Sequence, residues 1–256
     1  MNIRYITLTA NLKQTDATMS QHLRPDDLEY VQTDDLSYTF LNKKLNVHYR
    51  SQQGAQTESE QVFIKGTQIE KYDQWNIVEL GFGCAMNFQC LLQSNTGQPI
   101  HYIAIDHQPV PAEILPQENV AMRLANKALA EVRKSSAPVT IKHRNITLEL
   151  HPCPFDSATI PENFAHAFFH DPFSPSTNPE CWTSDCFRLA RRTLHHDGVL
   201  ATYGAAGHAR RAMAAAGFYI ATAKGPGRKR EITFASRNVS ALQHATLIRK
   251  YPPVVR

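Results

Sequence analysis

The sequence predicts an α/β fold built on a mostly parallel, doubly wound sheet, and three observations lead there. The chain has 256 residues, of which 42% are hydrophobic and 20% charged, and this suits one large α/β domain with a small appendage. Short apolar runs alternate with helical patterns at the spacing of successive strand–helix units. Two glycines, Gly81 and Gly83, join the first apolar run to a helical pattern. A strand, a glycine turn and a helix in that order are typical of a nucleotide-binding edge, although such glycine pairs also occur in ordinary turns.

Composition and charge exclude several classes of protein. No apolar run approaches the roughly 20 residues needed to span a bilayer, and residues 1–20 lack the apolar core of a signal peptide, so we expect a cytoplasmic protein without a membrane partner. The five cysteines are odd in number and form no C-x-x-C pair, so we predict neither a disulfide framework nor a metal site. The net charge of +4 permits a nucleic-acid partner without requiring one.

The N-terminal third is predicted to be an extension rich in β-structure. Residues 1–35 are polar and irregular, whereas residues 36–50 alternate between apolar and polar side chains around a polar turn at 42–44. This alternation predicts a small β-hairpin ahead of the main domain. The periodicity of residues 61–69 does not decide between strand and helix.

From residue 76 onward, strands and helices alternate regularly. Helical patterns are expected after the glycine turn and over 111–134, 178–194 and 205–216. Residues 222–230 are too few for a right-handed crossover, so the last strand is predicted to run antiparallel. We therefore divide the chain into an extension (1–70), a main domain (71–236) and a C-terminal tail (237–256). The seven predicted strands cover residues 77–80, 101–105, 146–150, 165–170, 198–203, 217–221 and 231–235.

Acidic residues follow three successive strands, at the sheet edge where open α/β sheets bind ligands. Asp106 ends the second strand, where a carboxylate can accept both ribose hydroxyls of a nucleoside. Asp156 comes just after the third strand, within reach of an adenine amino group, and Asp171 ends the fourth strand, facing a reaction centre. Each acid taken singly is equally explained as a helix cap or a solvated loop residue. Three of them at successive strand ends favour a ligand site.

Two residues near the glycine turn depart from simple patterns. Glu79 lies inside the first apolar strand, where a buried carboxylate costs several kcal/mol without a partner, and the amino group of a ligand is one candidate. Ala85 occupies the position of the third glycine in a G-x-G-x-G loop. If the backbone there has a positive φ, alanine costs ~1 kcal/mol and its methyl group points toward the ligand.

A doubly wound sheet with a reversed last strand is the architecture of class I S-adenosylmethionine (SAM) methyltransferases, and one segment makes the resemblance specific. Residues 170–175 (HDPFSP) and 178–183 (NPECWT) resemble the signature D-x-F-[AS]-P-x-x-N-P-x-x-W-[ST]. This signature belongs to the SAM-dependent methyltransferase domain of MnmC, which acts in tRNA 5-methylaminomethyl-2-thiouridine synthesis, and to its stand-alone form MnmD. Further similar stretches are 58–63 (ESEQVF), 79–88 (ELGFGCAMNF), 201–207 (ATYGAAG) and 225–231 (GPGRKRE).

The resemblance implies a Rossmann-like, seven-stranded methyltransferase domain over 71–236, with SAM as donor. It implies tRNA as partner and the aminomethyl nitrogen of a modified wobble uridine as acceptor, 5-aminomethyl-(2-thio)uridine becoming 5-methylaminomethyl-(2-thio)uridine. Asp171 is then the catalytic acid–base group, and Asn178 holds the surrounding loop with its prolines. Arg228, Lys229 and Arg230 would bind the tRNA, unless they form only a solvated basic turn. The residues expected to bind SAM are Glu79, Gly81, Gly83, Asp106, Asp156 and Asp171.

The two-domain members of the family carry a flavin-dependent oxidase, which we do not expect here, so no FAD is predicted. Functional coupling to the enzymes that make the aminomethyl-uridine precursor is also implied. The sequence departs from the family at Ala85, where glycine is usual, and at Asp106, where glutamate is usual. Two alternatives stay open: a class I methyltransferase-like protein acting on another amine, and a non-catalytic RNA-binding relative that has lost SAM.

Overall fold

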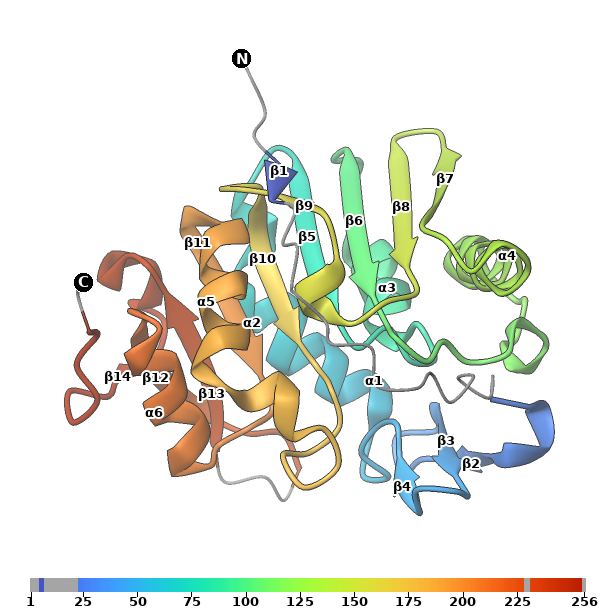
Figure 1. The fold of residues 1–256 in the computed structure, drawn as a ribbon, viewed down its shortest axis with the longest axis horizontal. Helices are drawn as coiled ribbons and strands as arrows, with labels where there is room; N and C mark the ends of the chain where they lie inside the picture. Colours follow the sequence, from blue (N-terminus) through green and yellow to red (C-terminus); the bar gives the residue numbers. More distant parts are fainter. Residues whose placement is uncertain (1–4, 7–22, 228–230, 255–256) are drawn as a thin grey trace, which may run out of the picture.

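A computed structural model of the chain describes residues 5–6, 23–227 and 231–254, and it places a nine-stranded sheet at the centre (Figure 1). Within these residues the strand order is β14-β12-β13-β11-β10-β5-β6-β8-β7. The predicted α/β class is confirmed. The strands of this sheet are β5 (Trp75–Leu80), β6 (Ile100–Ile105), β7 (Val139–His143), β8 (Ile146–His151), β10 (Ala165–His170), β11 (Leu194–Thr202), β12 (Tyr219–Lys224), β13 (Glu231–Ser236) and β14 (Thr246–Leu247).

The middle of the sheet is parallel and its last long strand is reversed, as predicted. Strands β8, β6, β5, β10 and β11 pair in parallel. Strand β13 lies between β11 and β12 and runs antiparallel to both. The short connection after β12 allows only this return, since a parallel strand needs a longer crossover.

Two short edge strands enlarge the predicted seven-stranded sheet to nine. Strand β7 pairs antiparallel with β8, and the turn between them includes Arg144 with φ of 50°. Strand β14 has two residues and pairs with β12, inside the segment predicted as a tail. The prediction of seven strands missed both. A two-residue strand has no periodicity to detect, and β7 and β8 read as one stretch of strand material.

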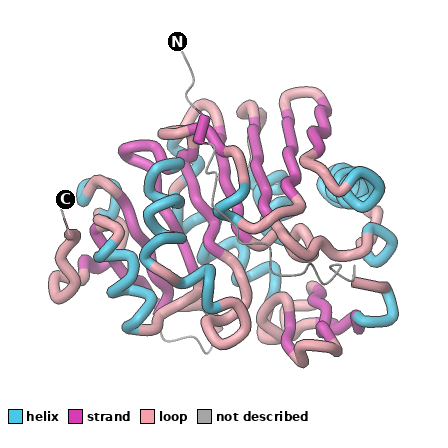
Figure 2. The backbone as a smooth tube through the Cα atoms, viewed as in Figure 1, coloured by secondary structure: helices cyan, strands magenta, loops and turns pink. Residues whose placement is uncertain are grey.

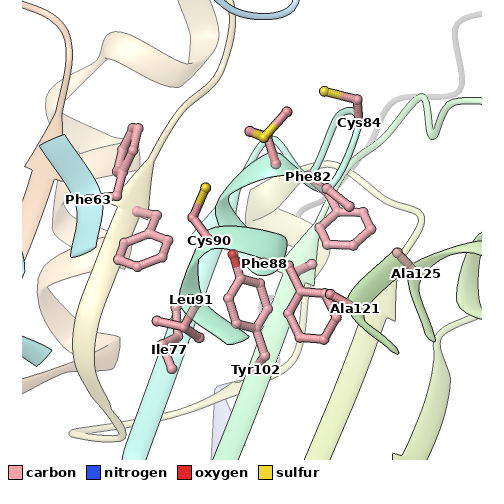
Figure 3. Packing of buried hydrophobic residues seen from close by; sticks show 14 of the residues in the cluster. Phe63, Ile77, Phe82, Cys84, Phe88, Cys90, Leu91, Tyr102, Ala121 and Ala125 are labelled. Atoms are coloured by element: carbon pink, nitrogen blue, oxygen red, sulfur yellow. The ribbon is translucent and has the colours of Figure 1, made fainter. Parts of the chain in front are cut away.

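Helices cover both faces of the sheet, as Figure 2 shows, and each face has its own apolar cluster. Helices α3 (Met86–Ser94) and α4 (Val120–Ser135) cover one face, and α5 (Ser184–Thr193) and α6 (Gly207–Ala215) cover the other. In the first cluster Phe88 meets Tyr102 edge to face, with ring centroids 5.0 Å apart (Figure 3). The central strands are buried on both faces, so their sequences are continuous apolar runs rather than alternating ones.

The N-terminal region contains the predicted hairpin with one additional strand. Strands β2 (Leu28–Gln32), β3 (Tyr38–Asn42) and β4 (Val47–His48) form a three-stranded antiparallel sheet. This sheet lies at the carboxyl-terminal end of the central parallel strands (Figure 1). Because β4 leads directly into residues 49 and 50, the small sheet brings these residues to the ligand-binding edge.

The remaining elements connect the two sheets. The ambiguous segment 61–69 is largely helical, within a run formed by α1 (Ala55–Glu58), a π-helical segment η2 (Ser59–Ile64) and α2 (Lys65–Thr67). Strand β1 (Tyr5–Ile6) pairs with β9 (Ile160–Pro161). Across the described part of the chain, helices are too short or too polar to cross a membrane. The domain boundaries at 70 and 236 remain predictions. Short 3-10 turns are η1 (Pro25–Asp27), η3 (Ile69–Lys71), η4 (Ala112–Ile114), η5 (Phe155–Ser157), η6 (Pro179–Trp182) and η7 (Val239–Leu242).

Candidate active site

A cavity of about 680 Å³ opens at the carboxyl ends of β5, β6 and β10. This volume lies in the range of small-molecule sites, about 300–1,000 Å³. The cavity wall combines the glycine turn, the ends of the neighbouring strands, the loop after β10 and part of the N-terminal sheet. Among the residues predicted for the site, Gly81, Gly83, Asp106, Asp156, Asp171 and Asn178 all line it.

The glycine turn is shaped by close contacts that exclude larger residues. Gly81 has φ of 91°, and a Cβ atom added there would lie 2.5 Å from the backbone oxygen of Asp171. Gly83 has φ of 51°, and a Cβ atom there would lie 3.0 Å from Cδ1 of Tyr49. Glycine at these two positions therefore lets the turn pack against the end of β10 and against the N-terminal sheet.

Asp106 is held in a fixed orientation by two backbone donors. The N–H of Gly83 donates to its Oδ2 at 2.9 Å, and the N–H of Gln108 donates to its Oδ1 at 3.0 Å. A carboxylate oxygen has more than one acceptor site, so both oxygens retain capacity for donors in the cavity. This arrangement suits the recognition of a vicinal pair of hydroxyl groups.

Asp156 and Asp171 approach the same cavity from other strand ends. Asp156 is exposed in η5, where the hydroxyl of Ser157 donates to its Oδ1 at 3.2 Å. Asp171 is the residue after β10, and its side chain is only 5% exposed. The rule that ligands bind at carboxyl ends of strands thus brought three acids together correctly.

Asp171 forms a buried ion pair with Arg50, a residue that the sequence did not suggest. Atom Nη1 of Arg50 contacts Oδ2 of Asp171, and Nδ2 of Asn87 donates to the same Oδ2 at 3.0 Å. Burial opposes the charged form of Arg50, but the carboxylates of Asp171 and Glu79 outweigh it and keep the pKa of the guanidinium above its usual value. One sequence signal pointed here: a carboxylate inside strand β5 requires a partner.

Glu79 lies below the cavity and does not line it. It is fully buried, and it accepts hydrogen bonds from Nδ2 of Asn87 and from the hydroxyl of Tyr102, both at 2.7 Å. Nη2 of Arg50 is 3.8 Å away. Burial raises the pKa of Glu79 to about 8, with Arg50 opposing the rise. Protein groups surround this carboxyl, so its role in binding SAM stays a prediction.

The loop after β10 is fixed by its own polar side chains. Oδ1 of Asn178 accepts the N–H of Phe173 at 3.1 Å, and its Nδ2 donates to Glu180 at 3.1 Å. Nε1 of Trp182 donates to the carbonyl of Phe173 at 2.9 Å, and the hydroxyl of Tyr203 donates to that of Pro172 at 2.8 Å. These bonds hold the cavity wall next to Asp171 in one shape.

Several residues of the cavity carried no sequence signal. Leu45 lies in the turn between β3 and β4, Tyr49 follows β4, and the rings of Tyr49 and Phe173 lie 5.0 Å apart. All five cysteines of the chain are free, and burial raises the pKa of each of the four at the cavity, so their thiols are neutral wall groups. These four are Cys84, Cys153, Cys181 and Cys186. In the described ranges, the histidines, cysteines and acids form no group of three or more suited to a metal ion.

Ala85 has the positive φ that its position in the turn suggested, 60°, but its methyl group is not part of the cavity wall. The residue is fully buried and precedes helix α3. Arg228, Lys229 and Arg230 lie outside the described residues. The preceding Gly227 is described, and a Cβ atom there would lie 3.0 Å from Oε1 of Gln53, close along the chain to Arg50.

A Rossmann-like sheet with this strand order, a glycine turn and acids at successive strand ends defines the fold of class I SAM-dependent methyltransferases. Comparison with known proteins agrees: residues 116–238 match a family described as S-adenosyl-L-methionine-dependent methyltransferase. The structure of MNMC2 from Aquifex aeolicus is similar with a TM-score of 0.68 and 24% identity, over 90% of this chain and 73% of that one. Spermidine synthase from Thermotoga maritima shares the fold with a TM-score of 0.52 and 11% identity, over 90% of this chain and 76% of that one.

Curated relatives carry the name tRNA 5-methylaminomethyl-2-thiouridine biosynthesis bifunctional protein MnmC. That of Cupriavidus metallidurans is 29% identical over 211 residues, which are 73% of this chain and 31% of the relative. That of Ralstonia nicotianae is 30% identical over 209 residues, again 73% and 31%. The chain thus spans about a third of the length of these relatives. The predicted resemblance is confirmed: this chain is similar in sequence to the MnmC proteins and has a SAM-dependent methyltransferase fold.

Proposed function

We propose that this protein transfers a methyl group from SAM to the aminomethyl nitrogen of a modified wobble uridine in tRNA. The reaction would convert 5-aminomethyl-(2-thio)uridine to 5-methylaminomethyl-(2-thio)uridine. The observation that carries the proposal is the single cavity shared by Asp106, anchored on the glycine turn, and Asp171, at the end of β10. Its context is a chain related to proteins named for this tRNA modification.

The donor would be held by the glycine turn and the acids of neighbouring strand ends. Gly81 and Gly83 leave the turn without side chains, and the anchored carboxylate of Asp106 presents acceptors suited to ribose hydroxyls. Asp156 would take the adenine end. Glu79 would act beneath the cavity through its contacts with Asn87 and Arg50. SAM, when bound, supplies an electrophilic methyl group.

The residues of the chain contribute to the reaction by positioning the acceptor amine and by taking up the proton that it releases. The acceptor amine attacks only in its neutral form, so a nearby carboxylate must align its N–H bonds and take up the released proton. Asp171 is suited to this role because it lies at the cavity wall and is paired with a cation. Asn178 would contribute by fixing the loop beside it.

The partner in this proposal is tRNA, with Arg228, Lys229 and Arg230 as the first candidates for phosphate contacts. The reaction also needs enzymes that deliver the aminomethyl-uridine. We infer functional coupling to these, because a primary amine on the uridine must be made before it can be methylated.

The test is methyl transfer from labelled SAM to tRNA prepared from a methyltransferase-deficient strain. We expect the wild-type protein to form labelled 5-methylaminomethyl-uridine derivatives. Asp171→Asn should form at least about 100-fold less of this product, because a proton-transfer group is lost. Asp106→Ala should weaken SAM binding by about 1–3 kcal/mol, because hydrogen bonds to two hydroxyls are lost. SAM binding without transfer to this tRNA, or transfer to a small amine instead, would overturn the assignment.

A further inference from the structure

We propose that Arg50 is a positioning residue that holds Asp171 ionised and correctly oriented, so that the N-terminal sheet supplies a working part of the active site. This inference rests on the proposed function, in which Asp171 receives the proton of the acceptor amine. It assigns to the region before the glycine turn a role in the reaction as well as in the fold.

Arg50 is fixed by the small sheet at its backbone and by the helical run that follows this sheet at its guanidinium. Its backbone N–H donates to Oγ1 of Thr39 in β3 at 2.8 Å. Its guanidinium lies over the ring of Phe63, 5.5 Å from the centroid, and the residue is 6% exposed. A side chain held at both ends in this way loses little further entropy on pairing with Asp171.

Among the carboxyl groups around this guanidinium, Asp171 and Glu79 form ion pairs with it, and they do so unequally. Arg50 is in direct contact with Asp171, whereas its nearest approach to an oxygen of Glu79 is 3.8 Å. Burial raises the pKa of Glu79, with Arg50 opposing the rise, so the ionised form of this carboxyl is disfavoured. The positive charge of Arg50 therefore lies closest to Asp171 and favours the ionised form of that carboxyl.

The geometry also fixes the direction of the Asp171 carboxylate. Oδ2 receives both Arg50 and Nδ2 of Asn87, and Asn87 donates to Glu79 through the same amide group. Glu79 is anchored in turn by the hydroxyl of Tyr102. The buried network thus sets the rotation of the Asp171 side chain while the residue remains in the cavity wall.

A buried ion pair is not an effective way to stabilise a fold when stability is its only role. Apolar side chains of similar volume commonly stabilise such a site as well or better, because they avoid desolvating two charges. Here the pair lines the cavity, where a carboxylate that stays ionised serves the reaction. Without a cation beside it, a carboxyl buried this deeply would have a raised pKa and would take up a proton.

The test compares Arg50→Met and Arg50→Lys with wild type, with Lys65→Met as control because Lys65 is an exposed cation on α2. We expect Arg50→Met to lower kcat about 100-fold with little change in the Kd of SAM. We expect the acid limb of its kcat–pH profile to move up by about 1–3 pH units, as for a carboxyl that loses a neighbouring cation. Arg50→Lys should restore part of the kcat and reverse part of the shift of the acid limb. Lys65→Met should match wild type. The charged or titratable groups around the Arg50–Asp171 pair are Glu58, Glu79, Cys84, Cys90, Tyr102 and Tyr203, all unchanged in the Arg50 variants.

A second measurement needs no substrate. In a double-mutant cycle of Arg50→Met with Asp171→Asn, followed by thermal unfolding, the double variant should melt higher than Arg50→Met alone, because Asp171→Asn removes the carboxylate left unpaired. An additive cycle would overturn the pairing. An unshifted pH profile with wild-type kcat in Arg50→Met would overturn the positioning role. If wild type itself transfers no methyl group, the proposed function fails, whereas the cycle still reports on the pair.

Discussion

At the scale of single residues, Gly81 has the most demanding position in the cavity wall. We predict that Gly81→Ala destabilises the fold by about 2–5 kcal/mol, combining strain at positive φ with overpacking. The overpacking arises because the new Cβ atom would lie 2.5 Å from the backbone oxygen of Asp171. Chemical denaturation measures the change, and SAM titration measures the accompanying loss of affinity.

Gly97 provides the matched control for this substitution. It also has a positive φ, 125°, but no atom lies within 4 Å of a Cβ atom built there. Gly97→Ala should therefore show the strain alone, about 1–3 kcal/mol, with unchanged SAM affinity. Equal losses in the two variants would show that the contact with Asp171 contributes nothing.

Ala85 leads to a prediction in which two effects nearly cancel. Replacing it by glycine relieves a φ of 60° that costs an L-residue about 1–2 kcal/mol. The change also removes a fully buried methyl group, worth about 0.8 kcal/mol, and adds freedom to the unfolded chain. We expect Ala85→Gly to change the free energy of unfolding by less than about 1 kcal/mol. The Kd of SAM should stay within about two-fold, since the methyl group is outside the cavity wall. A clear loss of SAM affinity, measured by calorimetry, would mean that the turn depends on alanine.

At the scale of secondary-structure elements, His170 fastens the end of β10 to the segment before α5. It is fully buried, and its Nε2 atom lies 2.8 Å from the carbonyl oxygen of Cys181, to which it donates. The ring also contacts Trp182 and Phe187, with centroids 4.6 and 4.8 Å away. Burial lowers the pKa of this imidazole to about 4, from an ordinary value of 6.5, so the native protein keeps it neutral.

The pH dependence of stability follows from that lowered pKa. The unfolded chain binds a proton at His170 below pH 6.5, whereas the folded chain binds it only near pH 4. Stability is therefore unaffected above pH 6.5 and falls by up to about 3 kcal/mol as the pH drops toward 4. His170→Gln keeps a donor but cannot titrate, so its unfolding free energy should fall less steeply over this window. Parallel curves for the two proteins would contradict the prediction.

The elements also show which parts of the site a sequence can reveal. Strands β5, β6 and β10 were predictable because they are buried on both faces, and the strand-end rule then placed Asp106, Asp156 and Asp171 in one cavity. The edge strands β7 and β14 were not, since one is joined to its neighbour by a tight turn and the other has two residues. The prolines around Asn178 predicted a rigid loop, and the hydrogen bonds of the Asn178 side chain hold this loop in place.

Contacts between distant parts of the chain lay beyond sequence reasoning. Arg50 follows a two-residue strand in a polar stretch, and nothing local distinguishes it from a solvated arginine. Because Glu79 lies within an apolar strand, its carboxyl group must have a partner, but the sequence does not indicate which residue provides it. Hydrogen bonds from Asn87 and Tyr102 and a cation from the N-terminal sheet provide it.

At the scale of the whole molecule, the central sheet and the N-terminal sheet together form one cavity. The central sheet supplies the acids and the glycine turn, and the N-terminal sheet supplies Leu45, Tyr49 and Arg50. The loop that follows β12 begins at this same end, since Gly227 lies next to Gln53. A large substrate approaching the cavity would therefore pass Gly227.

The last prediction concerns how this end of the molecule attracts tRNA. With a net charge of only +4, binding a polyanion depends on where cations are concentrated rather than on their total. We predict that Arg228→Gln with Lys229→Gln raises the KM for tRNA and reduces the slope of log KM against log salt by about one per lost phosphate contact. The Kd of SAM should not change.

Lys142→Gln with Arg144→Gln removes the same charge from the exposed β7–β8 hairpin at the opposite end of the sheet, and it should leave the KM and the slope as in wild type. If both double variants shift the KM equally, the effect is one of net charge. If neither does, the RNA reaches the cavity across another surface.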